Sequence, residues 1–149
     1  IWQNFRLLKA VAEAGAGAAE AWHRSTIEEW LDAAEYIMSE GNYNVVLSEG
    51  IRTFETATRN TLDISAVPVI KERSCLPIIV DPSHAAGKSA YIQSLSLAAA
   101  ACGADGLIIE VHPCPKCAMS DAKQQLTPAQ YAELFAEVRR VAQAVGREV

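Results

Sequence analysis

The chain has 149 residues, of which 50% are hydrophobic and 21% are charged, a balance typical of a globular domain rather than a disordered one. Its formal net charge of -5 argues against nucleic acid as the main partner, because phosphate binding requires a basic face. No apolar stretch approaches the roughly 20 residues of a membrane-spanning helix, and no signal sequence is visible, so we expect a cytoplasmic protein without a membrane partner.

The first part of the chain contains two predicted helices, one predicted strand and one stretch without a clear pattern. Residues 3–13 carry apolar side chains at helical spacing and are predicted as a helix. Residues 14–21 are mostly small and show neither a strand pattern nor turn chemistry. Ser25-Thr26-Ile27-Glu28 fits a capping box, which predicts a helix that runs to about Glu40. A short β-branched strand is predicted at residues 44–47.

The second part of the chain alternates between predicted helices and strands. After a polar, loop-like stretch at residues 53–62, Asp63 is predicted to cap a short helix that ends near Arg73. Ile78-Ile79-Val80 is an apolar run next to proline, which is typical of a strand buried on both faces. The remaining predicted elements are a helix at 89–102, a strand at 107–111 and a helix that begins with the capping box Thr127-Pro128-Ala129-Gln130 and ends near Val145.

This order of elements predicts the fold class. Strands that alternate with helices indicate right-handed βαβ units around a parallel sheet. Three or four such units correspond to half of a (β/α)8 TIM barrel, so we expect an α/β fold that forms roughly the second half of such a barrel. Residues 1–149 are expected to form a single domain. Because a half barrel has two unpaired strand edges, association with itself or with a partner is also expected.

Polar residues follow two neighbouring predicted strands, at the sheet edge where ligands bind in parallel α/β folds. His84 follows the strand at 78–80, Glu110 lies at the end of the next strand, and Asp121 lies in the loop beyond it. One imidazole and two carboxylates suit a first-row divalent metal such as Mn, Fe, Co or Zn. Such residues in loops are more often simply solvated, so residue type alone leaves both interpretations open.

Two further residues near strand ends have both a functional and a structural interpretation. Arg52 could hold a phosphate or a carboxylate through its forked donors, or it could pair with Glu49 or Glu55 at the surface. His112 could act as a metal ligand or a proton carrier if the strand continues past Glu110, or it could simply hydrogen-bond a neighbour.

Two local motifs are not expected to carry function. Cys114-Pro115-Lys116-Cys117 is a single C-x-x-C without a second pair, so we interpret it as two independent loop thiols rather than a zinc site or a redox disulfide. The stretch PSHAAGKS at residues 82–89 is similar to a P-loop, but Pro82 occupies the position of the first glycine and lacks an amide hydrogen. We therefore expect no nucleotide site and no cofactor-binding residues besides the candidate metal ligands.

Several longer stretches together resemble one enzyme family. They are GIRTFE at residues 50–55, RNTLD at 59–63, VDPSH at 80–84, GADG at 103–106, EVHP at 110–113 and SD at 120–121. Together with the predicted helix that starts at Thr26 and the stretch QNF at residues 3–5, they resemble 3-deoxy-D-arabino-heptulosonate-7-phosphate (DAHP) synthase, type I beta, in the same order and over nearly the whole chain. The resemblance implies a (β/α)8 barrel, of which the chain spans the part from the fourth to the eighth helix.

The resemblance also implies an activity and site residues. The family condenses phosphoenolpyruvate with erythrose 4-phosphate, the first step of the shikimate pathway to chorismate and the aromatic amino acids. The metal polarises the aldehyde for an aldol-like attack. By motif, His84, Glu110 and Asp121 correspond to three of the four metal ligands, with His84 and Glu110 also counted as catalytic. The fourth is a cysteine that none of this chain's cysteines matches. Arg52 corresponds to a phosphate ligand of phosphoenolpyruvate, and Asp81 to a residue behind the metal ligands or near erythrose 4-phosphate.

The sequence departs from the family before the second predicted helix. The family has Lys-Arg-Gly there, with a lysine that contacts phosphoenolpyruvate, whereas this chain has AAEAWH at residues 18–23. With suitable codons, these residues read one base later give Pro-Leu-Lys-Arg-Gly, so a frame shift is a hypothesis that the nucleotide sequence tests. LSEG at residues 47–50 is also one residue shorter than the family's pattern.

Because the family's first barrel half is not in this sequence, we expect the isolated chain to be inactive, and we expect a homo-oligomer. Two alternatives remain open. One is a non-catalytic half barrel that assembles with itself or a partner. The other is an enzyme similar to 3-deoxy-octulosonate-8-phosphate synthase, which shares fold and chemistry, although the motifs at residues 50–55 and 81–84 favour DAHP synthase.

Overall fold

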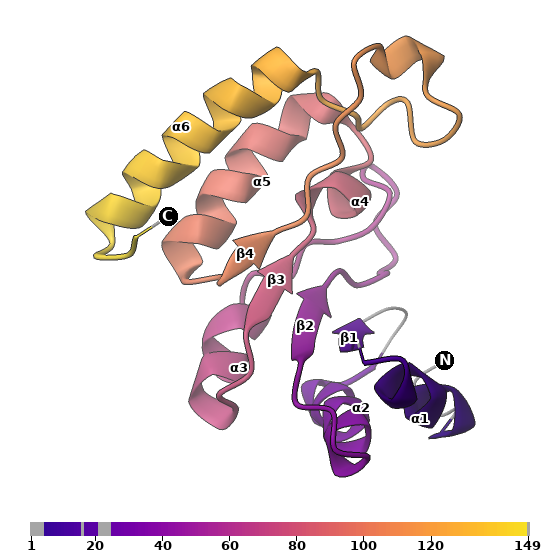
Figure 1. Ribbon diagram of the computed structural model, residues 1–149. Helices are drawn as coiled ribbons and strands as arrows, with labels where there is room; N and C mark the ends of the chain where they lie inside the picture. Colours follow the sequence, from indigo (N-terminus) through magenta and orange to yellow (C-terminus); the bar gives the residue numbers. More distant parts are fainter. Residues whose placement is uncertain (1–4, 16, 21–24, 149) are drawn as a thin grey trace.

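The structure is a computed structural model that describes residues 5–15, 17–20 and 25–148 (Figure 1). Its helices are α1 (Phe5–Glu13), α2 (Ile27–Ser39), α3 (Ala66–Arg73), α4 (Pro82–Ala86), α5 (Ser89–Cys102) and α6 (Pro128–Ala144), with a 3-10 turn, η1, at Pro115–Cys117. Its strands are β1 (Gly17–Glu20), β2 (Val45–Glu49), β3 (Ile78–Val80) and β4 (Gly106–Leu107). No helix in this described part of the chain is both long and apolar enough to cross a membrane.

The four strands form one parallel sheet in sequence order, β1-β2-β3-β4. Each pair of neighbouring strands is connected through at least one helix, and α5 and α6 lie side by side next to β4 (Figure 1). This arrangement confirms the predicted α/β class with parallel units. The carboxyl ends of all four strands therefore point to the same edge of the sheet.

The strand predicted from Ile78-Ile79-Val80 is confirmed as β3, in the interior of the sheet. Ile78 and Val80 are fully buried, and they pack with Leu47, Trp30 and Ile70 in the main apolar core. A second apolar cluster contains Ile92, Leu134 and Val138 between α5 and α6. The two clusters fix β3 and the start of β4, and so they fix the strand ends that carry the candidate site.

The expectation that residues 14–21 contain no strand is wrong. Gly17–Glu20 form β1 and pair in parallel with β2, from Gly17 opposite Val45 to Glu20 opposite Ser48. Glycine and alanine have little strand preference of their own, so the pairing with β2 supplies what the local sequence does not. Residues 21–24, part of the stretch where the family motif departs, lie outside the described residues, and the frame-shift hypothesis stays a prediction.

The helix α2 begins with a capping box, one residue later than predicted. Its N-cap is Thr26, whose hydroxyl accepts a hydrogen bond from the Glu29 amide at 3.2 Å. The Glu29 carboxylate in turn accepts from the Thr26 amide at 2.8 Å. The correct reading is therefore Thr26 with Glu29, rather than Ser25 with Glu28, because the reciprocal bonds require a spacing of three from the true N-cap.

The predicted cap is confirmed at the start of α6 and is wrong at the start of α3. Thr127 and Gln130 form the predicted capping box at α6. At α3 the N-cap is Ser65, not Asp63. Asp63 still acts nearby, because its carboxylate accepts a hydrogen bond from the Ser65 amide at 3.0 Å, as short acidic side chains in turns commonly do.

The chain leaves the sheet earlier after β4 than predicted. The strand expected at 107–111 is reduced to Gly106–Leu107, and Val111 forms only an isolated parallel bridge with Leu126. After β3, the short helix α4 begins at Pro82, which the sequence did not predict. The segments beyond β3 and β4 therefore turn toward each other, with the loop before α6 beside them.

Candidate metal centre

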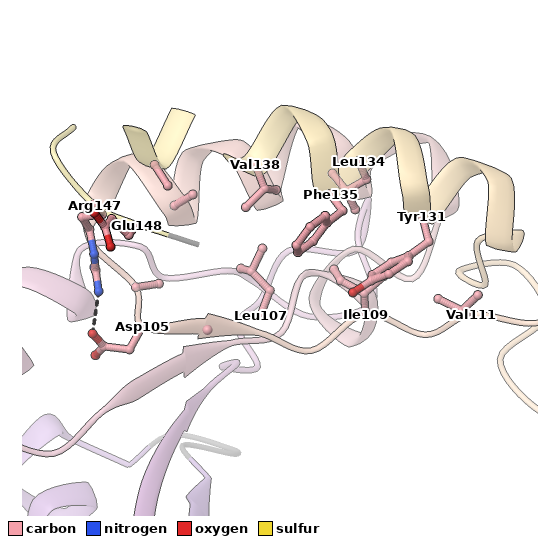
Figure 2. A pocket seen from close by; sticks show the side chains of 14 residues that line it. Asp105, Leu107, Ile109, Val111, Tyr131, Leu134, Phe135, Val138, Arg147 and Glu148 are labelled. Carbon is pink, nitrogen blue, oxygen red and sulfur yellow. Dashed lines mark hydrogen bonds and ion pairs between the residues drawn. The ribbon is translucent and has the colours of Figure 1, made fainter. Parts of the chain in front are cut away.

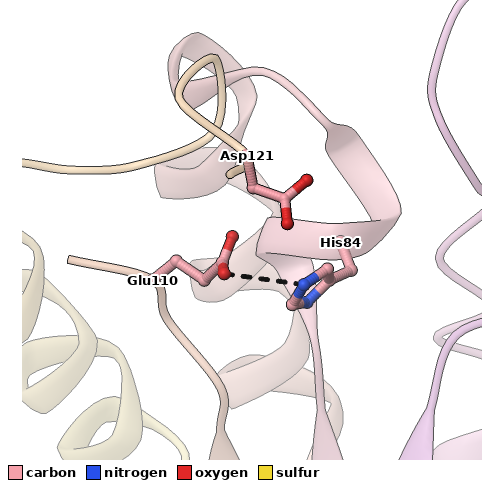
Figure 3. Close-up of side chains that lie close together, drawn as sticks. All are labelled: His84, Glu110 and Asp121. Carbon is pink, nitrogen blue, oxygen red and sulfur yellow. Dashed lines mark ion pairs between the residues drawn. The ribbon is translucent and has the colours of Figure 1, made fainter. Parts of the chain in front are cut away.

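His84, Glu110 and Asp121 come together beyond the carboxyl ends of β3 and β4 (Figure 3). Each offers one potential ligand atom, and these atoms lie within 4.8 Å of one another. The three residues come from α4, from the segment after β4 and from the loop before α6, and all are partly buried. The structure thus brings together the three residues that the sequence singled out.

Asp81 holds the imidazole of His84 in place. Asp81 is the N-cap of α4, and its Oδ1 accepts a hydrogen bond from the His84 amide at 3.0 Å. Its Oδ2 lies 2.8 Å from His84 Nδ1. Because a carboxylate accepts but does not donate, Nδ1 carries the proton of this bond. The other ring nitrogen, Nε2, lies 3.6 Å from Glu110 Oε1, so it faces the cluster.

Glu110 is fixed through both its backbone and its carboxylate. Its amide donates to Ser83 Oγ at 3.0 Å, and Ser83 is fully buried in α4. Its Oε2 accepts from Gln124 Nε2 at 2.6 Å, which leaves Oε1 on the side of His84. Its carbonyl accepts from the Leu126 amide at 2.9 Å. The segment after β4 is therefore tied to α4 on one side and to the loop before α6 on the other.

Asp121 lies in that loop with a left-handed backbone, at φ 55°. Aspartate adopts this conformation more readily than most residues other than glycine. Its Oδ1 forms an ion pair with Arg59 Nη1, and its carbonyl accepts a hydrogen bond from the Gln124 amide at 3.0 Å. This tight turn places Asp121 in the cluster and Gln124 beside it.

The charges around the cluster fit a divalent cation. Three carboxylates, those of Asp81, Glu110 and Asp121, lie around His84, and Arg59 forms an ion pair with one of them, Asp121. Carboxylates held close together repel each other, and a bound cation removes that repulsion. One nitrogen and two oxygen donors are also a suitable set for a first-row metal.

Arg52 is placed beyond the end of β2, outside this cluster. It is exposed, and it follows an isolated bridge between Ile51 and Thr61. Its proposed surface partner Glu55 instead accepts hydrogen bonds at 2.7 Å from the amides of Ala57 and Thr56, which lower the pKa of the Glu55 carboxyl.

The loop between Glu110 and Asp121 contains His112 and two cysteines. His112 Nδ1 accepts a hydrogen bond from the Cys114 amide at 3.0 Å, which fits the structural interpretation of this histidine. Cys114 and Cys117 are paired as a disulfide across η1, so their interpretation as independent thiols is wrong. The turn brings their Cα atoms to 5.4 Å, a separation that a disulfide can bridge.

Sequence reasoning missed three polar residues that hold the cluster: Ser83, Arg59 and Gln124. Ser83 and Arg59 lie in the VDPSH and RNTLD stretches, but nothing in those stretches indicates that Ser83 binds an amide or that Arg59 reaches Asp121. Gln124 follows Asp121 by three residues, and an amide side chain in a loop gives no chemical signal. Only its burial, at 2% exposure, shows that it has a role.

Comparison with known proteins gives the family. Residues 2–145 match the model of the DAHP synthetase I family. The phospho-2-dehydro-3-deoxyheptonate aldolase of Thermotoga maritima is 52% identical over 149 residues, which are 99% of this chain and 44% of that protein. The 2-dehydro-3-deoxyphosphooctonate aldolase of Desulfotalea psychrophila is more distant, at 33% identity over 95 residues, 56% of this chain and 34% of that protein.

Solved structures agree with this result. The crystal structure of the Thermotoga maritima DAHP synthase matches 99% of this chain and 44% of its own with a TM-score of 0.94 at 50% identity. A truncated form of that synthase matches 99% of this chain and 57% of its own with a TM-score of 0.95 at 50% identity. The fold is thus confirmed as part of a TIM-barrel enzyme. The chain spans less than half the length of its Thermotoga relative, and it belongs to the DAHP synthetase I family.

Proposed function

We propose that this chain binds a divalent metal ion through His84, Glu110 and Asp121, as part of an enzyme that condenses phosphoenolpyruvate with erythrose 4-phosphate. The observation that carries the proposal is the approach of the three ligand atoms to within 4.8 Å of one another. The name of the Thermotoga relative supports the same reaction class. The metal is one of the first-row ions Mn, Fe, Co or Zn, which accept mixed imidazole and carboxylate donors.

The roles of the individual residues follow from their contacts. His84 offers Nε2 to the metal because Asp81 binds Nδ1, an arrangement that fixes ring orientation in many metal sites. Of the two roles expected for Asp81, this contact supports the one behind the metal ligands. Three protein ligands leave coordination positions for substrate oxygens. A bound divalent metal supplies Lewis-acid polarisation of a carbonyl oxygen.

Arg52 is proposed to bind the phosphate of phosphoenolpyruvate. It follows β2, whose carboxyl end lies at the same edge of the sheet as those of β3 and β4. A guanidinium presents its donors in a fork that matches phosphate oxygens. The exposed position of Arg52 leaves it accessible to such a ligand.

The test is a titration of the chain with Mn²⁺ alone, followed by electron paramagnetic resonance of the free ion. Wild type should bind Mn²⁺, and His84→Ala should lose that binding. His112→Ala is the matched control. It also removes a histidine, but one whose Nδ1 accepts a hydrogen bond from the Cys114 amide and that lies outside the cluster. Equal binding by wild type and His84→Ala would refute the proposed site.

The reaction itself is proposed for the enzyme type and not for the isolated 149 residues, which correspond to 44% of the Thermotoga protein. We expect this chain alone not to consume phosphoenolpyruvate in the presence of erythrose 4-phosphate and Mn²⁺. Consumption of phosphoenolpyruvate above the background rate, followed by its ultraviolet absorbance, would contradict this expectation.

A half barrel that assembles with a second copy or a partner is the second candidate. A groove of about 330 Å³ lies between β4 and α6, and Leu107, Ile109 and Phe135 line it (Figure 2). Val111, which also lines the groove, and the nearby Ile108 are exposed, and in the described residues β4 pairs only with β3. Size-exclusion chromatography with light scattering separates the candidates: a dimer without bound metal favours assembly, and His84-dependent metal uptake favours the metal centre.

A further inference from the structure

Gln124 connects two of the proposed metal ligands. We propose that Arg59 and Gln124, here called the Arg59–Gln124 pair, are positioning residues that set the separation of the Glu110 and Asp121 carboxylates for a divalent cation. The proposal rests on the metal-binding function proposed above. It concerns residues that make no contact with the ion themselves and act through the ligands.

The contacts form one continuous chain of bonds. Gln124 Nε2 donates to Glu110 Oε2 at 2.6 Å, and Gln124 Oε1 accepts from Arg59 Nη1 at 3.2 Å. The same Arg59 nitrogen forms the ion pair with Asp121 Oδ1. The Glu110 and Asp121 carboxylates are therefore connected through the Gln124 amide and the Arg59 guanidinium. Glu110 takes part through Oε2, the oxygen that is not the one nearest His84.

The chemistry of these contacts requires an amide at position 124. The amide nitrogen is a donor and faces a carboxylate, whereas the amide oxygen is an acceptor and faces a guanidinium. With the amide reversed, two donors would face each other at Arg59 and two acceptors at Glu110, so the neighbours fix its orientation. A carboxylate at this position would repel Glu110, and a hydrocarbon would satisfy neither neighbour.

The pair leaves one oxygen of each carboxylate available. Glu110 uses Oε2 for Gln124, while Oε1 lies 3.6 Å from His84 Nε2. Asp121 uses Oδ1 for Arg59, which leaves Oδ2 outside that ion pair. Hydrogen bonds to the second oxygen orient a ligating carboxylate without occupying its metal-binding oxygen.

Arg59 is itself anchored to α4. Its amide donates to the Ala86 carbonyl at 3.4 Å, and the next residue, Asn60, donates from Nδ2 to the His84 carbonyl at 3.0 Å. Gly87 permits this approach: a Cβ on Gly87 would lie 2.6 Å from Arg59 Cβ, and the backbone there has φ 65°. These contacts hold the loop after β2 against α4, the helix that carries His84.

The test compares Mn²⁺ affinity and the visible absorption spectrum of bound Co²⁺ in wild type and Gln124→Met. Methionine has nearly the length of glutamine but makes neither hydrogen bond. We expect Gln124→Met to weaken Mn²⁺ binding by roughly 10–100-fold, the usual effect of losing a residue that orients metal ligands, and to change the Co²⁺ spectrum. Gln125→Met is the matched control and should leave both unchanged.

A second variant separates positioning from charge. Arg59→Met replaces a half-exposed side chain, so it avoids a buried substitution. Loss of its positive charge alone would strengthen cation binding, because unlike charges attract and like charges repel. The positioning role predicts the opposite, weaker Mn²⁺ binding with an altered Co²⁺ spectrum.

The outcomes distinguish this inference from the proposed function. Wild-type binding that depends on His84, with Mn²⁺ affinity unchanged in Gln124→Met and unchanged or tighter in Arg59→Met, overturns the positioning role and leaves the metal centre intact. Wild-type binding that is absent, or that persists in His84→Ala, overturns the metal centre and the pair with it. If Gln124→Met does not fold, the sign of the change in Arg59→Met decides.

Discussion

The carboxyl ends of β2 and β3 lie at the same edge of the sheet, but their side chains are held in different ways. Beyond β3, Asp81 and Ser83 are buried and bond to residues 84 and 110, and the cluster there includes contacts from three separate segments. Beyond β2, the loop is largely exposed, and Phe54 is 98% exposed. The side chain of Glu55 there binds the neighbouring Thr56 and Ala57 amides, whereas Arg59, farther along the loop, reaches Asp121 in the cluster.

This difference separates a preorganised site from an adaptable one. Contacts between distant segments fix side chains before a ligand arrives, and a site fixed in this way does not have to be ordered on binding. The proposed metal ligands therefore belong to the rigid part of the edge. The phosphate contact proposed for Arg52, on the exposed loop, would instead require its side chain to be ordered during binding.

The largest expected effect is on stability, and it tests whether the burial of β3 fixes the strand end that carries the cluster. Ile78→Ala removes a fully buried side chain at the start of β3, and such substitutions destabilise proteins by about 2–5 kcal/mol. Phe54→Ala, on the exposed loop, should change stability by less than about 0.5 kcal/mol. Urea unfolding followed by circular dichroism measures both. Similar losses for the two variants would contradict the contrast between the two strand ends.

A smaller effect is expected from Asp81→Asn, which probes the rigid site without removing its helix cap. Asparagine is as good an N-cap as aspartate, so the bond from the His84 amide can remain. Its NH₂ group would then face His84 Nδ1, which favours a proton on Nε2 and removes the lone pair offered to a metal. Mn²⁺ affinity should fall roughly tenfold or more. The exposed Asp32→Asn serves as the control.

The same contrast explains what the sequence could and could not predict. His84, Glu110 and Asp121 were predictable because each follows an apolar strand or its loop, and their chemistry is visible in the residue type. The family resemblance added the reaction. Gln124 was not predictable, because its importance comes only from burial and from partners at positions 59 and 110.

The strands show a similar limit. β3 was predicted because its own residues favour a buried strand, whereas β1 consists mainly of glycine and alanine and becomes a strand by pairing with β2. The end of β4 was predicted four residues too late, at 111 instead of 107, because apolar residues continue after the sheet pairing stops. In each case the information lies in the neighbouring segment and not in the local sequence.

The smallest expected effect concerns the amino end of β3, where Asp105 plays a purely structural part. Its carboxylate accepts hydrogen bonds from the Ile78 amide at 3.0 Å and from Arg147 Nη2 at 2.7 Å, and it pairs with Lys71. Burial raises the pKa of Asp105, but the contacts with Lys71, Ile78 and Arg147 outweigh it, and the pKa is lowered overall.

A carboxyl whose pKa is lower in the folded state stabilises that state above its unfolded pKa, about 3.9, and loses this contribution as the pH falls through the folded pKa. Asp105→Asn should therefore be less stable than wild type at pH 6, by about 1 kcal/mol or less because the ion pairs are partly exposed. The difference should shrink as the pH falls from about 4 to 2. Thermal unfolding across this range measures it. A difference that stays constant with pH would mean that the carboxylate charge contributes nothing and that Asp105 acts only through hydrogen bonds that asparagine cannot replace.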